Sequence, residues 1–224
     1  MQHAQGAAMD ERTPRERLLD AAEALVYAGG IHATGVDAIV RQAAATRKSF
    51  YTYFESKDAL VTAALERRHE RWMKWFVDGT RRGAPTPRAQ LLVIFDLLRV
   101  WFASPEFHGC AFLNAAGEIG PLDDPVRIVA REHKAQLLAF VQDMWAACLA
   151  AQGRDEGEAP VLARQWLILI DGAIGVALVS GSPDAARDAQ AAAERLIDAV
   201  VPEAKARQTR QSRSRIRMQD RSQS

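Results

Sequence analysis

Apolar residues recur at helical spacing along most of the chain, whereas the strict alternation that marks β-strands is nearly absent. The first such pattern, over residues 14–28, places Leu18 and Leu25 on one face. Thr13 stands where an N-cap is expected, with Glu16 at the third position after it, as in a capping box. These signals predict a first helix over residues 14–28.

Two short helical patterns follow within residues 34–54 and meet at a tight joint. Thr34 is predicted to cap the second helix and Thr46 the third, because each hydroxyl residue precedes a stretch with helical periodicity. Phe50 and Phe54 are four residues apart and therefore share one face of the third helix. The arrangement is typical of a helix-turn-helix, whose second helix enters the major groove of DNA.

The rest of the pattern is also helical, so an all-α fold is predicted. Further helices are expected over about residues 56–77, 91–102, 114–120, 125–151, 160–180 and 183–201. A linker rich in glycine, proline and arginine is expected at residues 79–87. The most apolar run, residues 166–179, is interrupted by Asp171 and is shorter than the roughly 18–20 residues that cross a bilayer, so no membrane span is expected.

Charge is distributed unevenly, although the net charge of the chain is only +1. Arginines gather in the first helices and in the final segment, where they alternate with polar residues and leave almost nothing to bury. This basic end either has no role beyond solubility or adds non-specific attraction to phosphates. The two cysteines are too few for a disulfide scaffold, and residues 1–16 contain no apolar signal-peptide core, which favours a reduced, cytoplasmic protein.

The third helix carries residue types that recognise DNA. Cationic, hydroxyl and phenol side chains are left on its outer face: Arg47, Lys48, Ser49, Tyr51, Thr52 and Tyr53. Arginine and lysine bind phosphates or guanine, and hydroxyl groups donate to phosphate oxygens. Thr34 and Thr46, at helix N-termini, and Lys57, at the start of the fourth helix, are expected to contact phosphates. The alternative for either tyrosine is that its ring packs against the first helix.

The stretch T-R-K-S-F-Y-T-Y-F-E-S-K-D-A-L, residues 46–60, resembles the TetR family of bacterial transcriptional regulators. The likeness extends over about residues 15–65, and the run G-C-A-F-L-N-A-A-G-E at residues 109–118 resembles a segment of some members. The resemblance implies an all-helical homodimer with a three-helix DNA-binding domain and a larger C-terminal helical bundle. It also implies a repressor that binds a palindromic operator in double-stranded DNA and is released by a small molecule.

Four segments are expected on this basis: a disordered N-terminus (1–12), a helix-turn-helix domain (13–56), a ligand-binding and dimerisation domain (57–201) and a basic disordered tail (202–224). Two positions depart from the family pattern, since Ala44 and Lys48 stand where glycine is frequent. If the turn is left-handed at Ala44, alanine there costs about 1 kcal/mol relative to glycine.

Large side chains of the C-terminal segment are candidates to line a cavity for a small, largely apolar effector. The candidate set is Trp72, Phe76, Phe95, Phe102, Phe107, Phe112, Asn114, Glu118, Trp166 and Asp171. The alternative for the aromatic members is ordinary core packing, and Asp171 is equally suited to an interface between the last two long helices of two subunits.

No cofactor, metal site or catalytic set is expected. The five histidines are scattered, the cysteines form no C-x-x-C pair, and no phosphate-binding glycine motif is present. A ligand-responsive DNA-binding regulator is therefore the main hypothesis. A helical enzyme and a TetR-like protein-interaction module without DNA binding are the alternatives, and a role as activator instead of repressor stays open.

Overall fold

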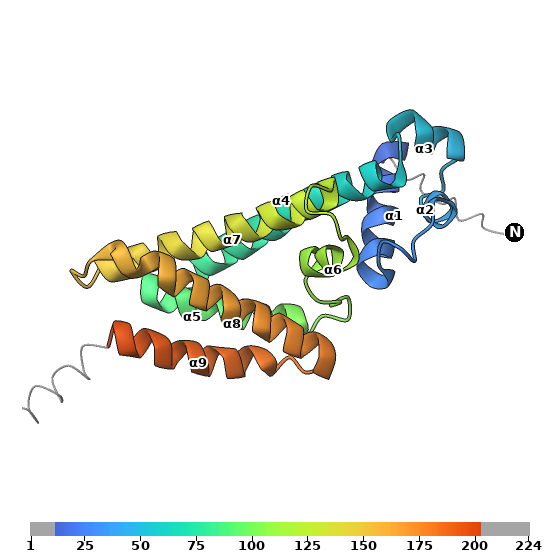
Figure 1. Cartoon of the computed structure of the whole chain (residues 1–224). Coiled ribbons are helices and arrows are strands. Elements are labelled where there is room, and N and C mark those ends of the chain that lie inside the picture. Colours follow the sequence, from blue (N-terminus) through green and yellow to red (C-terminus); the bar gives the residue numbers. More distant parts are fainter. Residues whose placement is uncertain (1–11, 203–224) are drawn as a thin grey trace, which may run out of the picture. The chain divides into compact units, whose positions relative to one another are not determined.

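The computed structural model describes residues 12–202, and every regular element in this range is a helix (Figure 1). The elements are α1 (Pro14–Gly29), α2 (Val36–Gln42), α3 (Arg47–Tyr53), α4 (Lys57–Gly83), α5 (Pro87–Phe102), α6 (Ala111–Glu118), α7 (Pro125–Ala150), the short η1 (Glu156–Glu158), α8 (Ala159–Ser180) and α9 (Ala185–Val200). The predicted all-α fold is confirmed. The disorder predicted for the two ends of the chain concerns segments that lie almost wholly outside the described residues.

The helices form two compact units. Unit 1 contains α1, α2, α3, the first part of α4, α6 and the first part of α7, up to Lys134. Unit 2 contains the rest of α4 from Lys74, α5, the rest of α7, α8 and α9. The packing boundary therefore falls within α4, whereas the functional division predicted from the sequence was placed at its start, before residue 57.

Unit 1 has a hydrophobic core beneath its first three helices. Phe50 is fully buried and packs with Leu18 and Ile39, so that α3 is held against α1 and α2. The N-terminus of α1 carries the predicted capping box: the Thr13 hydroxyl accepts the Glu16 N–H, and the Glu16 carboxylate accepts the Thr13 N–H at 2.7 Å. The cap fixes where α1 begins, and the buried phenyl ring fixes which face α3 turns outwards.

The fourth helix is longer than predicted. α4 continues to Gly83, through much of the expected linker at residues 79–87. A Cβ atom at Gly79 would lie 3.0 Å from the Leu97 side chain, and one at Gly83 would lie 2.9 Å from Val93, so both glycines allow α5 to approach α4 closely. The linker prediction was wrong for residues 79–83, because these glycines serve helix packing, and the connection between α4 and α5 is confined to residues 84–86.

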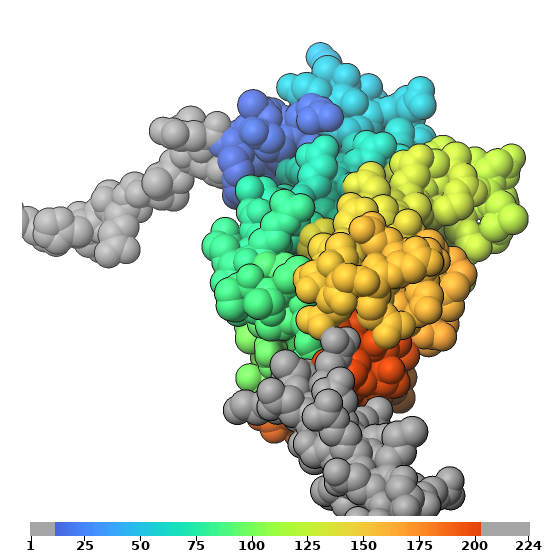
Figure 2. Space-filling view, turned by 90° about the vertical axis from the view of Figure 1, so that its left-hand side faces the viewer, coloured from blue at the N-terminus to red at the C-terminus, as the bar shows by residue number. Residues whose placement is uncertain are grey.

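The interior of unit 2 is aromatic. The Phe95 ring of α5 lies 5.6 Å from that of Trp166 on α8, which in turn lies 5.2 Å from the Trp145 ring on α7. α8 packs against α9, and the orange and red atoms of the two helices adjoin in the space-filling view (Figure 2). Large rings at these positions bury much apolar surface, which is the main source of stability in such a bundle.

α8 has two apolar faces. Trp166 is buried in unit 2, whereas Ile168, Val176 and Val179 point outwards, the last with 88% of its surface exposed. Residues 156–180 are long and apolar enough to cross a membrane by length and composition, so the apolar run is longer than predicted. Core helices of globular proteins pass the same test, and 39% of the residues in the most apolar window are buried inside the protein, so composition is weak support for a span.

Candidate DNA-binding surface

The outer face of α3 is exposed, as predicted. Arg47, Lys48 and Thr52 are exposed, and the tyrosines expose 58% (Tyr51) and 43% (Tyr53) of their surfaces. Neither tyrosine ring is therefore buried, and the DNA contacts predicted for both tyrosines stay predictions. We call the exposed side chains of Arg47, Lys48, Tyr51, Thr52 and Tyr53 the recognition surface. Two cations and three hydroxyl groups on one short helix suit phosphates and base edges.

Thr46 caps α3, as predicted. Its hydroxyl oxygen accepts the backbone N–H of Ser49 at 3.0 Å, and the Ser49 hydroxyl lies 3.0 Å from the same oxygen. The Thr52 hydroxyl donates to the Lys48 carbonyl one turn earlier, at 2.8 Å. Ser49 and Thr52 therefore have partners within α3, and a phosphate must compete with those bonds to accept from either hydroxyl.

Arg47 is held by an ion pair that the sequence did not reveal. Its Nε and one terminal nitrogen each donate to an oxygen of the Asp37 carboxylate on α2, both at 2.7 Å. The hydrogen bonds from Arg47 hold the pKa of Asp37 below its usual value, and Asp37 raises the pKa of Arg47. Both side chains are exposed, so the pair orients the guanidinium group more than it stabilises the fold.

The turn between α2 and α3 is left-handed at Ala44, where φ is +46°. Ala44 has the only positive φ of a non-glycine residue within residues 12–202, so the strain expected from the missing glycine is present. The backbone around it is bonded on both sides: the Ala45 N–H donates to Val40, and Arg17 Nε donates to the Ala43 carbonyl at 3.0 Å. The turn is thus fixed from α1 as well as from α2.

Two residues predicted to contact phosphates have partners inside unit 1. Thr34 is 5% exposed, and its hydroxyl donates to the Gly30 carbonyl at 2.7 Å. The N-cap of α2 is Gly35, without a side-chain bond, so the prediction that Thr34 caps this helix was wrong. Thr34 stabilises the loop before α2 instead of offering its hydroxyl to DNA.

Lys57 stabilises the same loop from the start of α4. Its Nζ donates to the carbonyls of Ile31, at 2.8 Å, and Thr34, at 3.2 Å. An ammonium group has three N–H donors, so one is left for a phosphate after these two bonds. The phosphate contact predicted for Lys57 stays a prediction.

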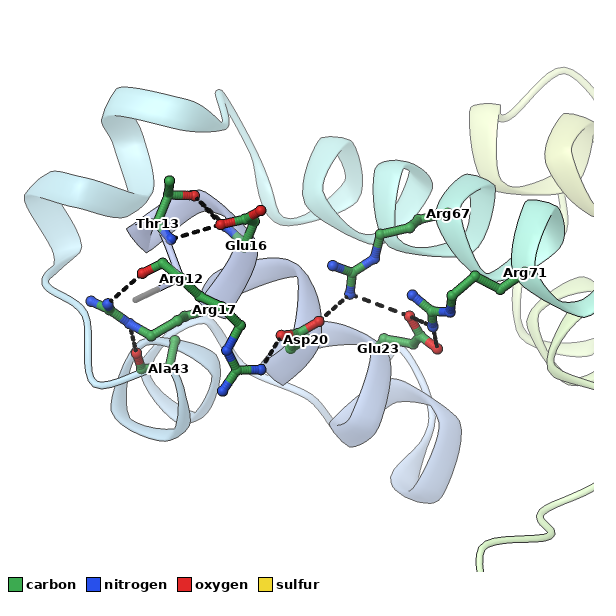
Figure 3. A network of polar contacts seen from close by, with 9 residues as sticks. All are labelled: Arg12, Thr13, Glu16, Arg17, Asp20, Glu23, Ala43, Arg67 and Arg71. Carbon is green, nitrogen blue, oxygen red and sulfur yellow. Dashed lines mark hydrogen bonds and ion pairs between the residues drawn. The ribbon is translucent and has the colours of Figure 1, made fainter. Parts of the chain in front are cut away.

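Ion pairs join α1 to α4 (Figure 3). Arg67 donates to Asp20 at 2.6 Å and lies 3.4 Å from Glu23, while Arg68 donates to Glu23 at 3.0 Å and Arg71 contacts the same carboxylate. Glu23 is the most buried member, with 11% of its side chain exposed, so its three arginines replace most of its water. No local sequence pattern predicts this network, because its partners are more than 40 residues apart.

Glu118, at the C-terminal end of α6, holds the loop between α1 and α2. Its two carboxylate oxygens accept the backbone N–H groups of Ile31, at 3.0 Å, and His32, at 2.9 Å. Gly30 has φ +92°, and a Cβ atom there would lie 2.9 Å from the same carboxylate, so a side chain at this position would strain the backbone and displace the carboxylate. Glu118 was predicted to bind an effector, and that role stays a prediction beside this observed contact.

The predicted effector residues fall in both units. Phe76, Phe95, Phe102, Phe107, Trp166 and Asp171 belong to unit 2, and Trp72, Phe112, Asn114 and Glu118 belong to unit 1. Phe102 and Phe107 are in contact, with ring centroids 4.9 Å apart, and Phe95 contacts Trp166. Asn114 and Glu118 line a small, mostly apolar cavity between α6, α1 and α4, with room for about one water molecule. One cavity lined by the whole set stays a prediction.

A histidine pair lies beside the unit 1 members of this set. His133 on α7 is buried, stacks on Phe112 with 3.7 Å between ring centroids, and contacts Trp72. Its Nδ1 lies 3.0 Å from Nδ1 of His69, so one ring donates and the other accepts. Burial lowers the pKa of His133 to about 2, and Lys134 and His69 add to the shift. His133 is therefore neutral beside His69, and no group of three metal-ligating side chains occurs within residues 12–202.

Comparisons with known proteins agree with this geometry. The family model of bacterial regulatory proteins of the tetR family matches residues 18–64, which contain α2 and α3. A solved structure, a TetR transcriptional regulator of Streptomyces avermitilis, is 31% identical, has a TM-score of 0.66, and is aligned over 77% of this chain and 90% of its own.

Two curated relatives are also transcriptional regulators. The repressor NemR of Escherichia coli is 25% identical over 163 residues, which cover 70% of this chain and 82% of NemR. An HTH-type transcriptional regulator of Lactococcus lactis is 28% identical over 117 residues, 52% of this chain, and the match spans only 60% of that relative's length. These proteins are regulators, so the alternative of a helical enzyme is set aside. The chain belongs to the TetR family of bacterial regulatory proteins, which are DNA-binding transcriptional regulators and not enzymes.

Proposed function

We propose that this chain is a ligand-responsive repressor that binds a palindromic operator as a homodimer and is released by a small, largely apolar effector. The observation that carries the proposal is the recognition surface on α3, whose cations and hydroxyl groups are exposed while Phe50 is buried beneath them. The similarity to NemR, which is named a repressor, supports repression over activation. Its place of action is the cytoplasm, where bacterial DNA is found.

The exposed apolar side of α8 supports the homodimer. Val161, Ile168, Val176 and Val179 recur along this side with Gly172 and Gly175 between them, and we call these six residues the α8 face. Nothing lies within 4 Å of a Cβ atom built at either glycine, so a second helix has room to approach. A dimer through this face buries side chains that are otherwise in water, and it provides two recognition surfaces for a palindrome.

Unpaired donors in unit 2 support an effector that is mostly apolar but carries an acceptor atom. The indole N–H groups of Trp145 and Trp166 and the hydroxyl of Thr80 are buried without a hydrogen-bond partner among the described residues. A buried donor without a partner costs about 1–3 kcal/mol, which a carbonyl or ether oxygen of a bound molecule would offset. The surrounding rings, such as Phe95, would bind the apolar part.

Release from DNA requires that effector binding change the recognition helices. Dimers read two half-sites when their recognition helices are about 34–36 Å apart, one turn of DNA. α4 is continuous from Lys57 to Gly83 and contributes to both compact units, so a shift of this helix is the proposed route of coupling. A coupling free energy of about 1–3 kcal/mol is usual for such systems. An effector that binds without changing operator affinity would contradict this mechanism.

The test is a selection of bound duplexes from a random DNA pool, followed by titration of the selected sequence. We expect a palindrome to be enriched, and we expect the double variant Arg47→Ala with Lys48→Ala to bind it at least about 100-fold more weakly, because each base contact contributes about 1–3 kcal/mol. Arg82→Ala, an exposed cation at the end of α4, is the matched control and should bind normally. No enrichment of any duplex would favour an interaction module without DNA binding.

A further inference from the structure

Unit 1 has a groove between α6 and the start of α7. The groove has a volume of about 190 Å³ and is lined from α6, from the loop that follows it and from α7. It belongs to neither the recognition surface nor the aromatic interior of unit 2. An engineered apolar cavity of about 150 Å³ holds a benzene molecule, so the groove has room for one aromatic ring with a short side arm.

Most of the lining is apolar. Phe112 and Ala130 are buried and form the floor, and Leu113 and Leu122 stand at the edge with 41% and 66% of their surfaces exposed. Exposed leucines beside a hollow are energetically unfavourable in water, and a ring placed between them removes apolar surface from solvent. The groove therefore favours a molecule with a flat or compact apolar body.

One side of the groove is cationic. Arg127, Arg131 and Lys134 follow one another at spacings of four and three residues on α7 and so line the same side. Arg127 donates to the Ala116 carbonyl, and Arg131 donates to the Leu122 carbonyl at 3.4 Å. A guanidinium group has five N–H donors, so these bonds position both groups and leave donors for a ligand. None of the described side chains that line the groove is acidic.

We propose that this groove binds a monocyclic aryl carboxylate. The ring lies between Leu113 and Leu122 over the floor, and the carboxylate accepts hydrogen bonds from Arg131 and Lys134. The size limits the ligand to about one ring, and the three cationic side chains along one side of the groove favour an anion. The chain's own arginine-rich segment, residues 205–221, has the same sign of charge as the groove and is a poor occupant.

The groove is lined by α6, the helix that also carries Glu118 and so contacts the loop before α2. α6 turns Phe112, Leu113 and Ala116 towards the groove, while Asn114 and Glu118 face the cavity against α1 and α4. The Glu118 carboxylate in turn holds the loop that leads into α2. A ligand in the groove therefore contacts the same short helix that positions the helix-turn-helix.

The test uses 3-phenylpropionate as the probe and the full chain without DNA, so that its outcome does not depend on operator binding. Isothermal titration and saturation-transfer NMR should show binding with a Kd on the order of 1 mM or tighter. The neutral match 3-phenylpropanamide should bind at least about 10-fold more weakly, because it lacks the charge that the cations recognise. Equal affinity of the two compounds would overturn the proposal.

Variants locate the site. We expect Arg131→Ala combined with Lys134→Ala, and separately Leu122→Ser, to weaken 3-phenylpropionate at least about 10-fold. Arg154→Ala removes an exposed arginine from the loop after α7 and should leave the affinity unchanged. Thermal melting of each variant verifies folding, and Leu122→Ser, which alters a largely exposed side chain, provides the test if the double variant does not fold.

The proposal is contradicted if no binding is seen at a ligand concentration 10-fold above the expected Kd. It is also contradicted if both groove variants keep the affinity, because the compound would then bind in the interior of unit 2. Binding at high concentration only, without preference for the carboxylate, would mean that the compound is an adventitious additive only. If an acidic helical peptide binds the groove and 3-phenylpropionate does not, the occupant is a protein partner and the small-molecule assignment is wrong.

Discussion

The exposed sides of α3 and α8 have opposite chemistry. The recognition surface on α3 presents Arg47, Lys48 and hydroxyl groups, whereas the α8 face presents Ile168, Val176 and other aliphatic side chains with glycines between them. Both helices bury one side in their own unit. The difference lies in what the free side can bind: phosphates and base edges satisfy the first, and only another apolar surface satisfies the second.

The two units also differ in how they hold these surfaces. Unit 1 joins its helices with ion pairs and hydrogen bonds, such as Glu23 with its arginines and Glu118 with the loop at Ile31. Unit 2 relies on ring packing around Trp166, and the indole N–H groups of Trp145 and Trp166 have no hydrogen-bond partner among the described residues. Directional bonds suit a surface that must keep one geometry on DNA. A loosely satisfied apolar interior suits a site that accepts a guest.

A charge in the α8 face should have the largest effect. We expect Val176→Asp to convert the protein to a monomer and to lower operator affinity by at least about 100-fold, because a buried unpaired carboxylate at a dimer interface costs several kcal/mol. Val176 is exposed within its own subunit, so the fold should persist. Light scattering coupled to size-exclusion chromatography measures the mass, and a DNA titration measures the affinity.

The matched control for this variant is Val100→Asp. Val100 is 65% exposed on α5, outside the α8 face, and its replacement should change neither mass nor affinity. If Val176→Asp stays dimeric, the α8 face is not the interface, and the contrast between the two surfaces loses its functional meaning.

A single cation of the recognition surface should have a smaller effect. Lys48→Ala removes one positive charge, and we expect operator affinity to fall about 10-fold and the slope of log affinity against log salt to decrease by about 1. Titrations at several salt concentrations measure both quantities. An unchanged salt slope would show that Lys48 does not contact a phosphate, whereas a loss confined to one operator position would show that it contacts a base.

The outward side of α3 was predictable from sequence because the rule behind it is local. Phe50 and Phe54 are four residues apart, and their burial dictates which side faces water. The capping box at Thr13 and the cap at Thr46 were predictable for the same reason. The bond between Arg47 and Asp37 was not, because it joins two helices through a turn whose angle the sequence does not specify.

The role of a glycine is harder to predict from sequence, because glycine occurs in linkers, at helix caps and at close contacts between helices. Gly79 indicated a linker, but it lies within α4 and admits the Leu97 side chain of α5. Thr34 indicated a cap, but a glycine caps α2 and the threonine is buried. The bonds made by Glu118 join segments more than 80 residues apart, and no local pattern predicts such pairs.

The buried histidine of unit 1 should make stability depend on pH. The pKa of His133 is about 2 in the folded protein, against about 6.5 when unfolded, so the unfolded state binds the extra proton between these values. The contribution of a neutral His133 to the free energy of unfolding is complete above about pH 6.5. It is lost as the pH falls below this value, at about 1.4 kcal/mol per pH unit. The free energies of unfolding measured with urea at pH 7 and pH 5 should therefore differ by about 2 kcal/mol because of this residue.

His133→Phe should remove that part of the pH dependence, while His32→Gln, at an exposed position, should keep it. The histidine pair of His133 with His69 is a polar contact inside unit 1. A His133→Phe variant with the full pH dependence would show that another group binds the proton on unfolding.

The smallest effect is expected at the turn that sets α3 against α2. Ala44→Gly relieves a positive φ of +46°, and we expect the free energy of unfolding to rise by about 0.5–1 kcal/mol, since the relief of strain exceeds the entropy that glycine adds to the unfolded chain. Ala45→Gly is the matched control: its φ is not positive, so glycine there should destabilise the protein by a similar amount. If both substitutions destabilise, the turn relaxes in solution, and the outward angle of the recognition surface is not fixed by the backbone at Ala44.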